Sequence, residues 1–149
     1  MNVIEEISIN GNKDEVWNVI TDIDNCKNVI SSIIQVSILN KPPSGLIGLE
    51  WKETREMFGK KATEIMWITD AVAGEYYATR AESHGAVYIS NLSLKEKDNK
   101  TTLTMSFTGK PQTTIAKVLS FLMAPLINGS IRKALIKDLQ DIKAFVEKS

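Results

Sequence analysis

The sequence has few residues that bind metals or form disulfides. Its 149 residues include one cysteine, Cys26, and one histidine, His84. A single cysteine cannot form an internal disulfide, and zinc sites need several Cys or His ligands at close spacing. The chain also lacks a Gly-rich phosphate loop, paired histidine ligands and a Ser/His/Asp set. We therefore expect no metal and no cofactor, and the hydrolase, kinase and metalloenzyme classes find no support.

Net charge and long apolar runs are also missing. The 18 Lys and Arg residues balance the 18 Asp and Glu residues, so the chain has no long-range attraction for nucleic acid. No run approaches the roughly 20 apolar residues that cross a bilayer, and the alternating N-terminus is unlike a signal peptide. These features predict a single domain of residues 1–149 in the cytoplasm, without nucleic acid or integral membrane association. A homodimer is left open.

Apolar periodicity predicts a strand and then short helices near the N-terminus. Apolar and polar residues alternate along residues 3–9, as in a strand with one buried face. Asn12, followed three residues later by Glu15, forms a capping box at the start of a helical pattern. We expect this helix to break near Asp22 into two short helices. The β-branched residues 33–39 predict the second strand.

Residues 47–109 predict five consecutive strands, and the turns between them predict the registers. A turn at Asp98 and Asn99 pairs Leu94 with Leu103, Leu92 with Met105 and Ser90 with Phe107. A turn at His84 and Gly85 pairs Tyr88 with Ala81, Ser90 with Thr79 and Leu92 with Tyr77. Both sets lie on one face, which we expect to be the inner face of the sheet.

The hairpin that precedes these strands carries charged residues. A turn at Gly59 and Lys60 places Arg55 opposite Glu64, Glu53 opposite Met66 and Trp51 opposite Ile68. If this face points inward, the charged pair forms a polar end of a pocket. If it points outward, the pair is an ordinary cross-strand salt bridge. The sequence leaves the two alternatives open.

Helical spacing returns after Pro111 and predicts one long amphipathic C-terminal helix. Pro125 lacks a backbone donor and clashes with the preceding turn, and residues 128–130 are poor helix formers, so we expect a kink there. The complete order predicts an α+β helix-grip fold. In it, a curved antiparallel seven-stranded sheet wraps around the C-terminal helix, and two short helices follow the first strand.

This arrangement predicts a hollow interior. A helix is only about 10 to 12 Å across with its side chains, so one helix need not fill a deeply curved sheet. Small-molecule sites are mostly apolar with a few polar groups. The ligand-binding residues that we predict from the sheet are Trp51, Glu53, Arg55, Glu64, Met66, Tyr77, Thr79, Tyr88, Ser90, Met105 and Phe107. The helix is predicted to contribute a roof of Leu119, Leu122, Met123 and Leu126. A solid core made of the same side chains is the alternative.

Three phrases of the sequence carry a resemblance to a known superfamily. They are ISINGNKDEVWNVITDIDN, IGLEWKETREMFGKKATEIMWIT and the last helix with Arg132, Leu135, Leu139 and Phe145. Together they resemble the START-related superfamily, which includes polyketide cyclases, the birch-pollen-allergen fold and coenzyme Q-binding proteins. The resemblance covers nearly the whole chain and implies a hydrophobic ligand cavity for lipids, isoprenoids, polyketides or hormone-like molecules. It does not imply one reaction.

Three functions follow from these observations. The first is a noncatalytic binder or carrier of a small hydrophobic molecule. The second is a cyclase or dehydratase that uses Arg55, Glu53 or Tyr88 to polarise a carbonyl and move a proton. The third is a protein-interaction or stress-response module. His84 lies in a predicted rim turn and Cys26 has no histidine near it in sequence, so we assign no catalytic residue.

Overall fold

The structure is a computed structural model that describes residues 2–57, 59–83 and 85–148. In this part of the chain the elements follow the order that the sequence predicts. They are β1 (Asn2–Asn10), α1 (Lys13–Thr21), the 3-10 helix η1 (Ile23–Asn28), β2 (Ile33–Asn40), β3 (Glu50–Met57), β4 (Lys60–Val72), β5 (Tyr76–Ser83), β6 (Ala86–Lys97), β7 (Lys100–Pro111) and α2 (Thr114–Lys148).

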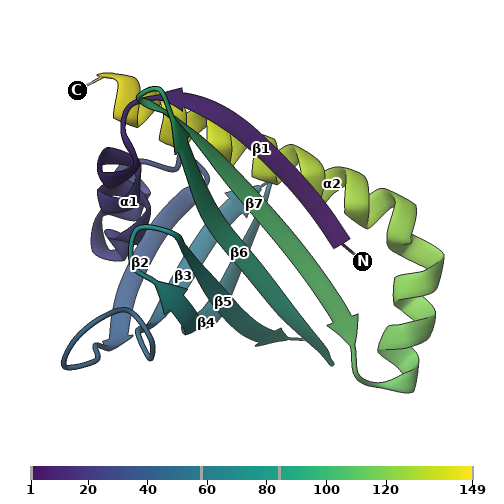
Figure 1. Cartoon of the computed structure of the whole chain (residues 1–149). Coiled ribbons are helices and arrows are strands. Elements are labelled where there is room, and N and C mark those ends of the chain that lie inside the picture. The colour runs from purple at the N-terminus through teal and green to yellow at the C-terminus, as the bar shows by residue number, and fades with distance from the viewer. Residues whose placement is uncertain (1, 58, 84, 149) are drawn as a thin grey trace.

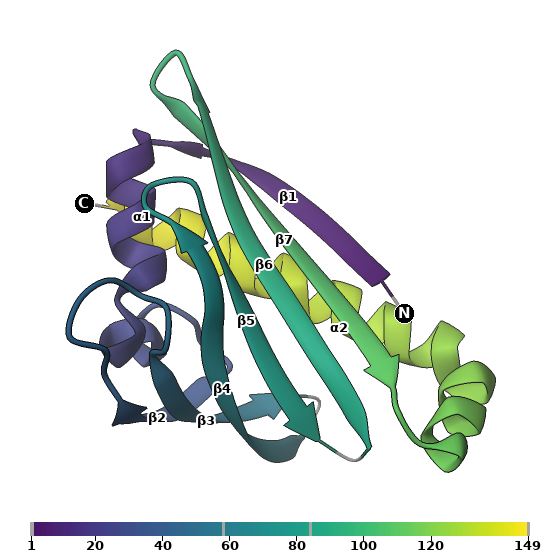
Figure 2. The same cartoon turned by 60° about the horizontal axis from the view of Figure 1, so that its bottom comes forward.

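These strands form one antiparallel sheet that curves around α2. The strand order is β1-β7-β6-β5-β4-β3-β2, with every neighbouring pair antiparallel. The C-terminal part of α2 runs across the concave side next to β1, and α1 lies at the same end of the sheet as the C-terminus (Figures 1 and 2). The predicted α+β helix-grip fold is therefore confirmed.

The short helices begin and break where the sequence predicts. The backbone N–H of Glu15 donates to Asn12 Oδ1 at 2.9 Å, so Asn12 caps the first turn of α1. Helix α1 ends at Thr21 and η1 begins at Ile23, which confirms the break at Asp22. Each of the two helices buries apolar side chains, Val16 and Ile20 in α1 and Ile23 and Cys26 in η1.

Two of the three predicted hairpin registers are confirmed. Strands β6 and β7 pair as expected, and Asp98 and Asn99 both have positive φ, 53° and 61°, as a two-residue type I′ turn requires. Strands β5 and β6 also have the predicted register, from Tyr77 opposite Leu92 to Ser83 opposite Ala86. His84 itself lies outside the described residues. The inner faces of these strands are therefore the ones that the sequence assigns.

The predicted register of β3 and β4 is wrong by two residues. Met57 pairs with Lys60, so the turn comes one residue earlier than predicted, and Gly59 has the positive φ of 77°. Glu53 is therefore opposite Glu64, and Arg55 is opposite Ala62. A shift of two residues preserves the side-chain period of a strand. The predicted face is consequently retained although every partner changes.

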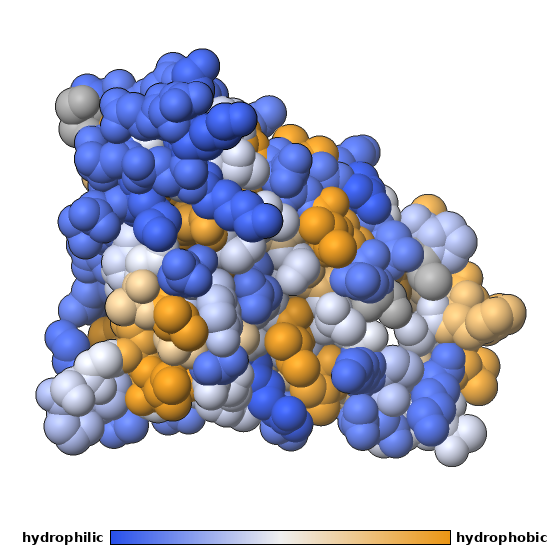
Figure 3. Space-filling view, in the orientation of Figure 1, coloured by the Kyte–Doolittle hydropathy of each residue, from blue (hydrophilic) through white to orange (hydrophobic). Residues whose placement is uncertain are grey.

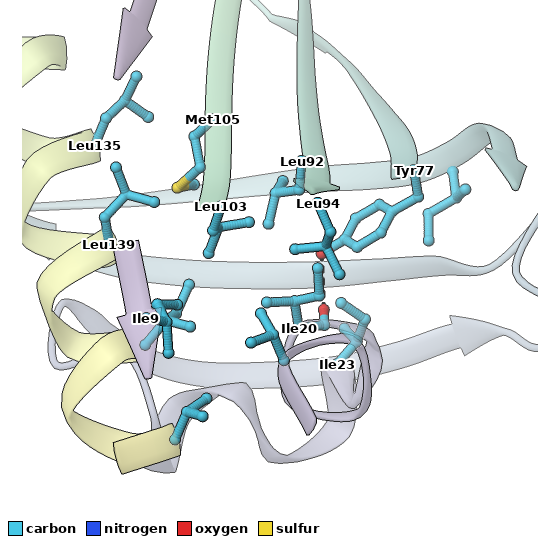
Figure 4. Close-up of a cluster of buried hydrophobic side chains, with 14 of the residues drawn as sticks. Ile9, Ile20, Ile23, Tyr77, Leu92, Leu94, Leu103, Met105, Leu135 and Leu139 are labelled. Carbon is cyan, nitrogen blue, oxygen red and sulfur yellow. Dashed lines mark hydrogen bonds between the residues drawn. The ribbon is translucent and has the colours of Figure 1, made fainter. Parts of the chain in front are cut away.

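The hydrophobic core lies between the sheet, α1 and the C-terminal part of α2. Figure 4 shows how side chains from these elements meet. The residues labelled there are Ile9, Ile20, Ile23, Tyr77, Leu92, Leu94, Leu103, Met105, Leu135 and Leu139, all of them buried. This core holds one end of the sheet closed around α2.

Helix α2 is bent, as predicted. Its N-terminal arm, Thr114–Met123, and its C-terminal arm, Pro125–Lys148, meet at an angle of 77°, and the bend is visible in Figure 1. Pro125 lies at the bend, where it cannot donate to the preceding turn. Among the described residues no single helix has the length and apolar composition to cross a bilayer, and only the two bent arms together meet that criterion.

The N-terminal arm of α2 exposes its apolar side chains. Phe121 is 83% exposed and Ile115 is 75% exposed. Figure 3 shows apolar side chains at the end of the molecule formed by this arm. The exposed large hydrophobic residues of this region are Ile115, Val118, Leu119, Phe121, Leu122, Met123 and Leu126. The arm therefore does not fold back onto the core.

Candidate functional site

An inner cavity of about 340 Å³ lies between the sheet, the short helices and the C-terminal arm of α2. The sheet contributes Trp51, Glu53, Arg55, Ala62, Glu64, Met66, Tyr77, Thr79, Ser90, Leu92, Met105 and Phe107. Helix α2 contributes Ile131, Ala134, Leu135, Asp138 and Ile142. Most of this wall is apolar, and a space of this size exceeds the roughly 150 Å³ cavity that holds a benzene molecule in an engineered core.

A second, outer cavity of about 420 Å³ lies beneath the N-terminal arm of α2. Its walls come from the far ends of the strands and from Ala116, Leu119, Ser120, Met123, Ile127 and Ile131 of α2. The two cavities share Glu64, Met66, Phe107 and Ile131 as wall residues. They therefore lie next to each other along the concave face of the sheet.

The structure brings the predicted sheet residues together around these two cavities. Tyr88 lines only the outer cavity, where its ring stacks on Phe107 with centroids 5.6 Å apart. The other predicted sheet residues line the inner cavity, the outer cavity or both. The alternation along each strand located this face correctly, because a strand directs every second side chain to the same side.

The predicted roof is only partly correct. Leu119 and Met123 line the outer cavity, but Leu122 and Leu126 line neither cavity and are 68% and 74% exposed. The 77° bend at Pro125 separates the N-terminal arm from the C-terminal arm. The inner cavity is roofed instead by the C-terminal arm, through Ile131, Ala134 and Leu135.

Several wall residues were not predicted from the sequence. The short helices and the segment after them contribute Val19, Ile20, Ile23, Cys26, Val29, Ile30 and Ile33 to the inner cavity. Asp138 of α2 was also missed, although its position gave a signal. It lies on the apolar stripe between Leu135 and Leu139, where a charged residue is unexpected. A single acidic residue on the buried face of a helix indicates a polar site in the protein interior.

One charged cluster lies in the wall of the inner cavity. Arg55 Nε donates to Glu53 Oε2 at 2.6 Å, and Arg55 Nη1 donates to Asp138 Oδ2 at 2.9 Å and to Ser32 Oγ at 3.0 Å. Trp51 Nε1 donates to the other oxygen of Glu53 at 3.2 Å. The inward alternative for Arg55 is thus correct, but its partners are Glu53 and Asp138, and Glu64 is not among them.

Burial acts on the ionisation of this cluster. Asp138 is 3% exposed, and burial raises the pKa of its carboxyl group while Arg55 opposes that increase. Burial alone would lower the pKa of Arg55, but Asp138 and Glu53 raise it. Arg55 therefore stays charged. A buried ion pair is stable only with good geometry and further hydrogen bonds. The bond that Arg55 donates to Ser32 and the bond that Trp51 donates to Glu53 therefore support the cluster.

Cys26 and Tyr77 act as structural residues of the wall. Burial, assisted by the negative charge of Glu53, raises the pKa of the Cys26 thiol to about 12, so it is protonated at neutral pH. Burial also raises the pKa of Tyr77, whose hydroxyl donates to the backbone oxygen of Ile20 at 2.8 Å. This bond ties β5 to α1. Neither side chain has the properties of a nucleophile or base at neutral pH.

The described residues contain no group of three or more His, Cys, Asp or Glu side chains that could hold a metal ion. The two acids of the charged cluster, Glu53 and Asp138, are both bonded to Arg55. The site is therefore described by its cavities and its one charged cluster.

Comparison with known proteins identifies the fold. No family profile and no curated protein matches the sequence. Among solved structures, a START superfamily protein from Mycobacterium smegmatis has a TM-score of 0.82 at 11% identity, and the match covers 99% of this chain and 97% of that one. Ara h 8.0201 has a TM-score of 0.77 at 14% identity, with 100% and 99% covered.

A third similar structure comes from polyketide chemistry. The di-domain ARO/CYC StfQ of the steffimycin biosynthetic pathway has a TM-score of 0.82 at 12% identity, over 99% of this chain and 51% of that one. The chain thus has the fold shared by START, polyketide cyclase and Ara h 8 proteins, and the resemblance in the sequence is confirmed at the level of fold. At these identities the likeness is one of fold alone.

Proposed function

We propose that this chain acts as a single ligand-binding domain, residues 1–149, that binds or carries a small hydrophobic molecule in the inner cavity. The observation that carries the proposal is the combination of a volume of about 340 Å³ with mostly apolar walls and one polar cluster. Ligand sites of proteins have this size and composition. A cytoplasmic location and a homodimer stay predictions.

Filling the cavity is the direct test. Ala134 lines the inner cavity from α2, whereas Ala144 lies on the exposed face of the same helix. Ala134→Phe should therefore displace the ligand, and Ala144→Phe should leave binding unchanged. A ligand that binds only the folded state raises the thermal midpoint, and the increase grows with the ratio of ligand concentration to Kd. We expect copurified mass in native mass spectrometry, or stabilisation by a hydrophobic ligand, in the wild type and in Ala144→Phe only.

Two results would contradict the proposal. One is the absence of any bound mass together with no thermal stabilisation by a broad panel of hydrophobic molecules. The other is equal ligand binding by Ala134→Phe and Ala144→Phe, which would place the binding site outside the cavity. Circular dichroism of both variants checks that the larger side chain has not unfolded the protein.

A cyclase or dehydratase is the second candidate, and the position of Arg55 in the cavity wall favours it. A guanidinium group can polarise a carbonyl oxygen of a bound substrate. The candidate catalytic residues do not all lie in one cavity, however, because Tyr88 lines the outer cavity and Arg55 lines the inner cavity. Mass spectrometry distinguishes the candidates. A bound polyketone that loses the mass of water in the wild type, but not in Arg55→Met, would support catalysis.

A further inference from the structure

The charges in the cavity walls are unbalanced. Among the described wall residues of both cavities, the charged side chains are Glu53, Arg55, Glu64 and Asp138. No lysine and no second arginine contributes to either wall in that part of the chain. Three carboxyl groups therefore share one cation. The balance stays negative even when Asp138 is protonated.

The positive charge of Arg55 is already paired. Its guanidinium group bonds to Glu53 at 2.6 Å and to Asp138 at 2.9 Å. A guanidinium that bonds to two carboxylates has little attraction left for a third anion. An incoming ligand carboxylate would need to compete with Glu53 and Asp138 for Arg55, and both are buried and held in place.

Among the described residues of the two cavity walls, Glu64 is the charged residue that lacks a charged or hydrogen-bonding partner. It lines both cavities and makes no hydrogen bond or ion pair with the described residues. In the sheet it lies directly opposite Glu53, at a position where two like charges repel. The carboxylate of Glu64 therefore lies where the two cavities meet, beside a second acid, and no cation in the described part of the chain pairs with it.

We propose that the site prefers hydrophobic ligands that carry a protonated amine and rejects those that carry a carboxylate. This inference rests on the proposed function, since it concerns the ligand of the same cavities. The amine binds Glu64 and screens it from Glu53, while its apolar part occupies the inner cavity. A neutral hydroxyl group, which can also donate to Glu64, binds with intermediate affinity. Charge interactions are stronger beside such apolar walls than in bulk water, because the local dielectric constant is lower.

Three ligands of equal chain length test the preference. Decylamine, decanol and decanoate share one apolar tail, and at pH 7 the first is a cation and the last is an anion. Titration calorimetry below the micelle concentration should give an affinity for decylamine at least tenfold higher than for decanoate, with decanol between them. Glu64→Gln should reduce that ratio severalfold. Glu56→Gln, a change of an exposed acid on the neighbouring strand β3, should leave the ratio unchanged.

The outcomes separate this inference from the proposed function. If all three ligands bind in the cavity with similar affinity, or decanoate binds best, the amine preference is wrong while ligand binding stands. An unchanged ratio in Glu64→Gln also overturns it. If none of the three binds, the amine preference fails, and the broad ligand panel then decides the proposed function. If Ala134→Phe leaves their binding intact, the cavity is not the site and both proposals fail.

Discussion

The two arms of α2 are both rich in apolar residues, yet only one of them buries these residues. In the C-terminal arm, Leu135, Leu139, Ile142 and Val146 follow a helical stripe that packs against the sheet and α1, and each is at most 7% exposed. In the N-terminal arm, Val118 and Leu122 are more than half exposed. Apolar composition therefore does not decide burial.

The difference teaches that burial needs a partner surface at the correct distance. The C-terminal arm lies beside β1 and is tied to the sheet by the ion pair between Arg132 and Glu5. The N-terminal arm leaves that direction at Pro125 and covers only the outer cavity. This contrast gives four predictions, which run from the largest expected effect to the smallest.

Leu139→Ala should have the largest effect on stability. Leu139 is 2% exposed, so its removal leaves a cavity and should lower the free energy of unfolding by about 4 kcal/mol. The matched change in the other arm, Leu122→Ala, should cost less than about 0.5 kcal/mol. Urea denaturation measures both. Equal losses would show that the N-terminal arm is packed against the protein in solution.

Arg55→Met should lower the free energy of unfolding by about 3 kcal/mol, because it leaves Glu53 and Asp138 buried without the cation that they share. Burial already raises the pKa of Asp138, and loss of Arg55 raises it further. The folded state then holds a proton more tightly than the unfolded state, so the deficit is largest near pH 7 and shrinks as the pH falls. Denaturation at several pH values measures this.

The other arm provides the control for that experiment. Lys117 is an exposed cation of the N-terminal arm, and Lys117→Met should change stability by less than about 0.5 kcal/mol at any pH. If Arg55→Met were as mild as Lys117→Met, the charged cluster would contribute nothing to the attachment of the C-terminal arm.

Asp141→Asn should lower the free energy of unfolding by about 1 kcal/mol. Asp141 accepts from the backbone N–H of Ser31 at 2.9 Å and from Lys137 at 2.6 Å. Partial burial alone would raise the pKa of Asp141, but the bonds from Lys137 and Ser31 lower it below the ordinary value of 3.8. Its stabilisation is therefore complete above that value and is lost as the pH falls through the lower, folded-state pKa.

The pH dependence is the critical measurement for Asp141. The difference in stability between wild type and variant should be present at about pH 7 and should shrink well below pH 3.8. A difference of the same size at both pH values would mean that the bonds to Ser31 and Lys137 do not depend on the charge of Asp141.

Gly129→Ala should stabilise the protein by about 0.5 to 1 kcal/mol, the smallest effect of the four. Gly129 lies in α2 just after the bend, and an added Cβ would meet no atom within 4 Å. Alanine restricts the unfolded chain at no steric cost. Gly74→Ala is the control, because its φ of 75° should make the same change destabilising. Thermal denaturation would show opposite shifts.

The sequence predicted the fold well because each element depends on local rules. Alternation identified the strands, Asn12 identified the start of α1, and Asp98 with Asn99 determined a register. The β3–β4 register was wrong because the position of the turn near Gly59 depends on one residue, and one residue in the turn moves every partner by two. Local sequence patterns therefore predict which face of the sheet a side chain occupies more reliably than they predict its partner on the neighbouring strand.

The candidate site was harder to predict than the fold. The sheet wall followed from the strand period, but the contributions of Val29 and Ile30 depend on where the segment after η1 lies in the tertiary structure. Leu122 and Leu126 were predicted to lie in the roof of the cavity. Pro125 predicts where the helix bends, but helical spacing does not predict that the bend is as large as 77°. Asp138 became a partner of Arg55 only when β3 and α2 came together, 83 residues apart in sequence.

By itself the sequence determined the order of the elements, the inward faces of the strands and the position of the break in α2, because these depend on side-chain period and on the missing N–H of Pro125. Only the tertiary structure decided which arm of α2 covers the inner cavity and which carboxylates pair with Arg55. It also decided that no cation among residues 2–57, 59–83 and 85–148 pairs with Glu64. Those outcomes depend on distances between segments far apart in the chain, and no local pattern specifies such distances.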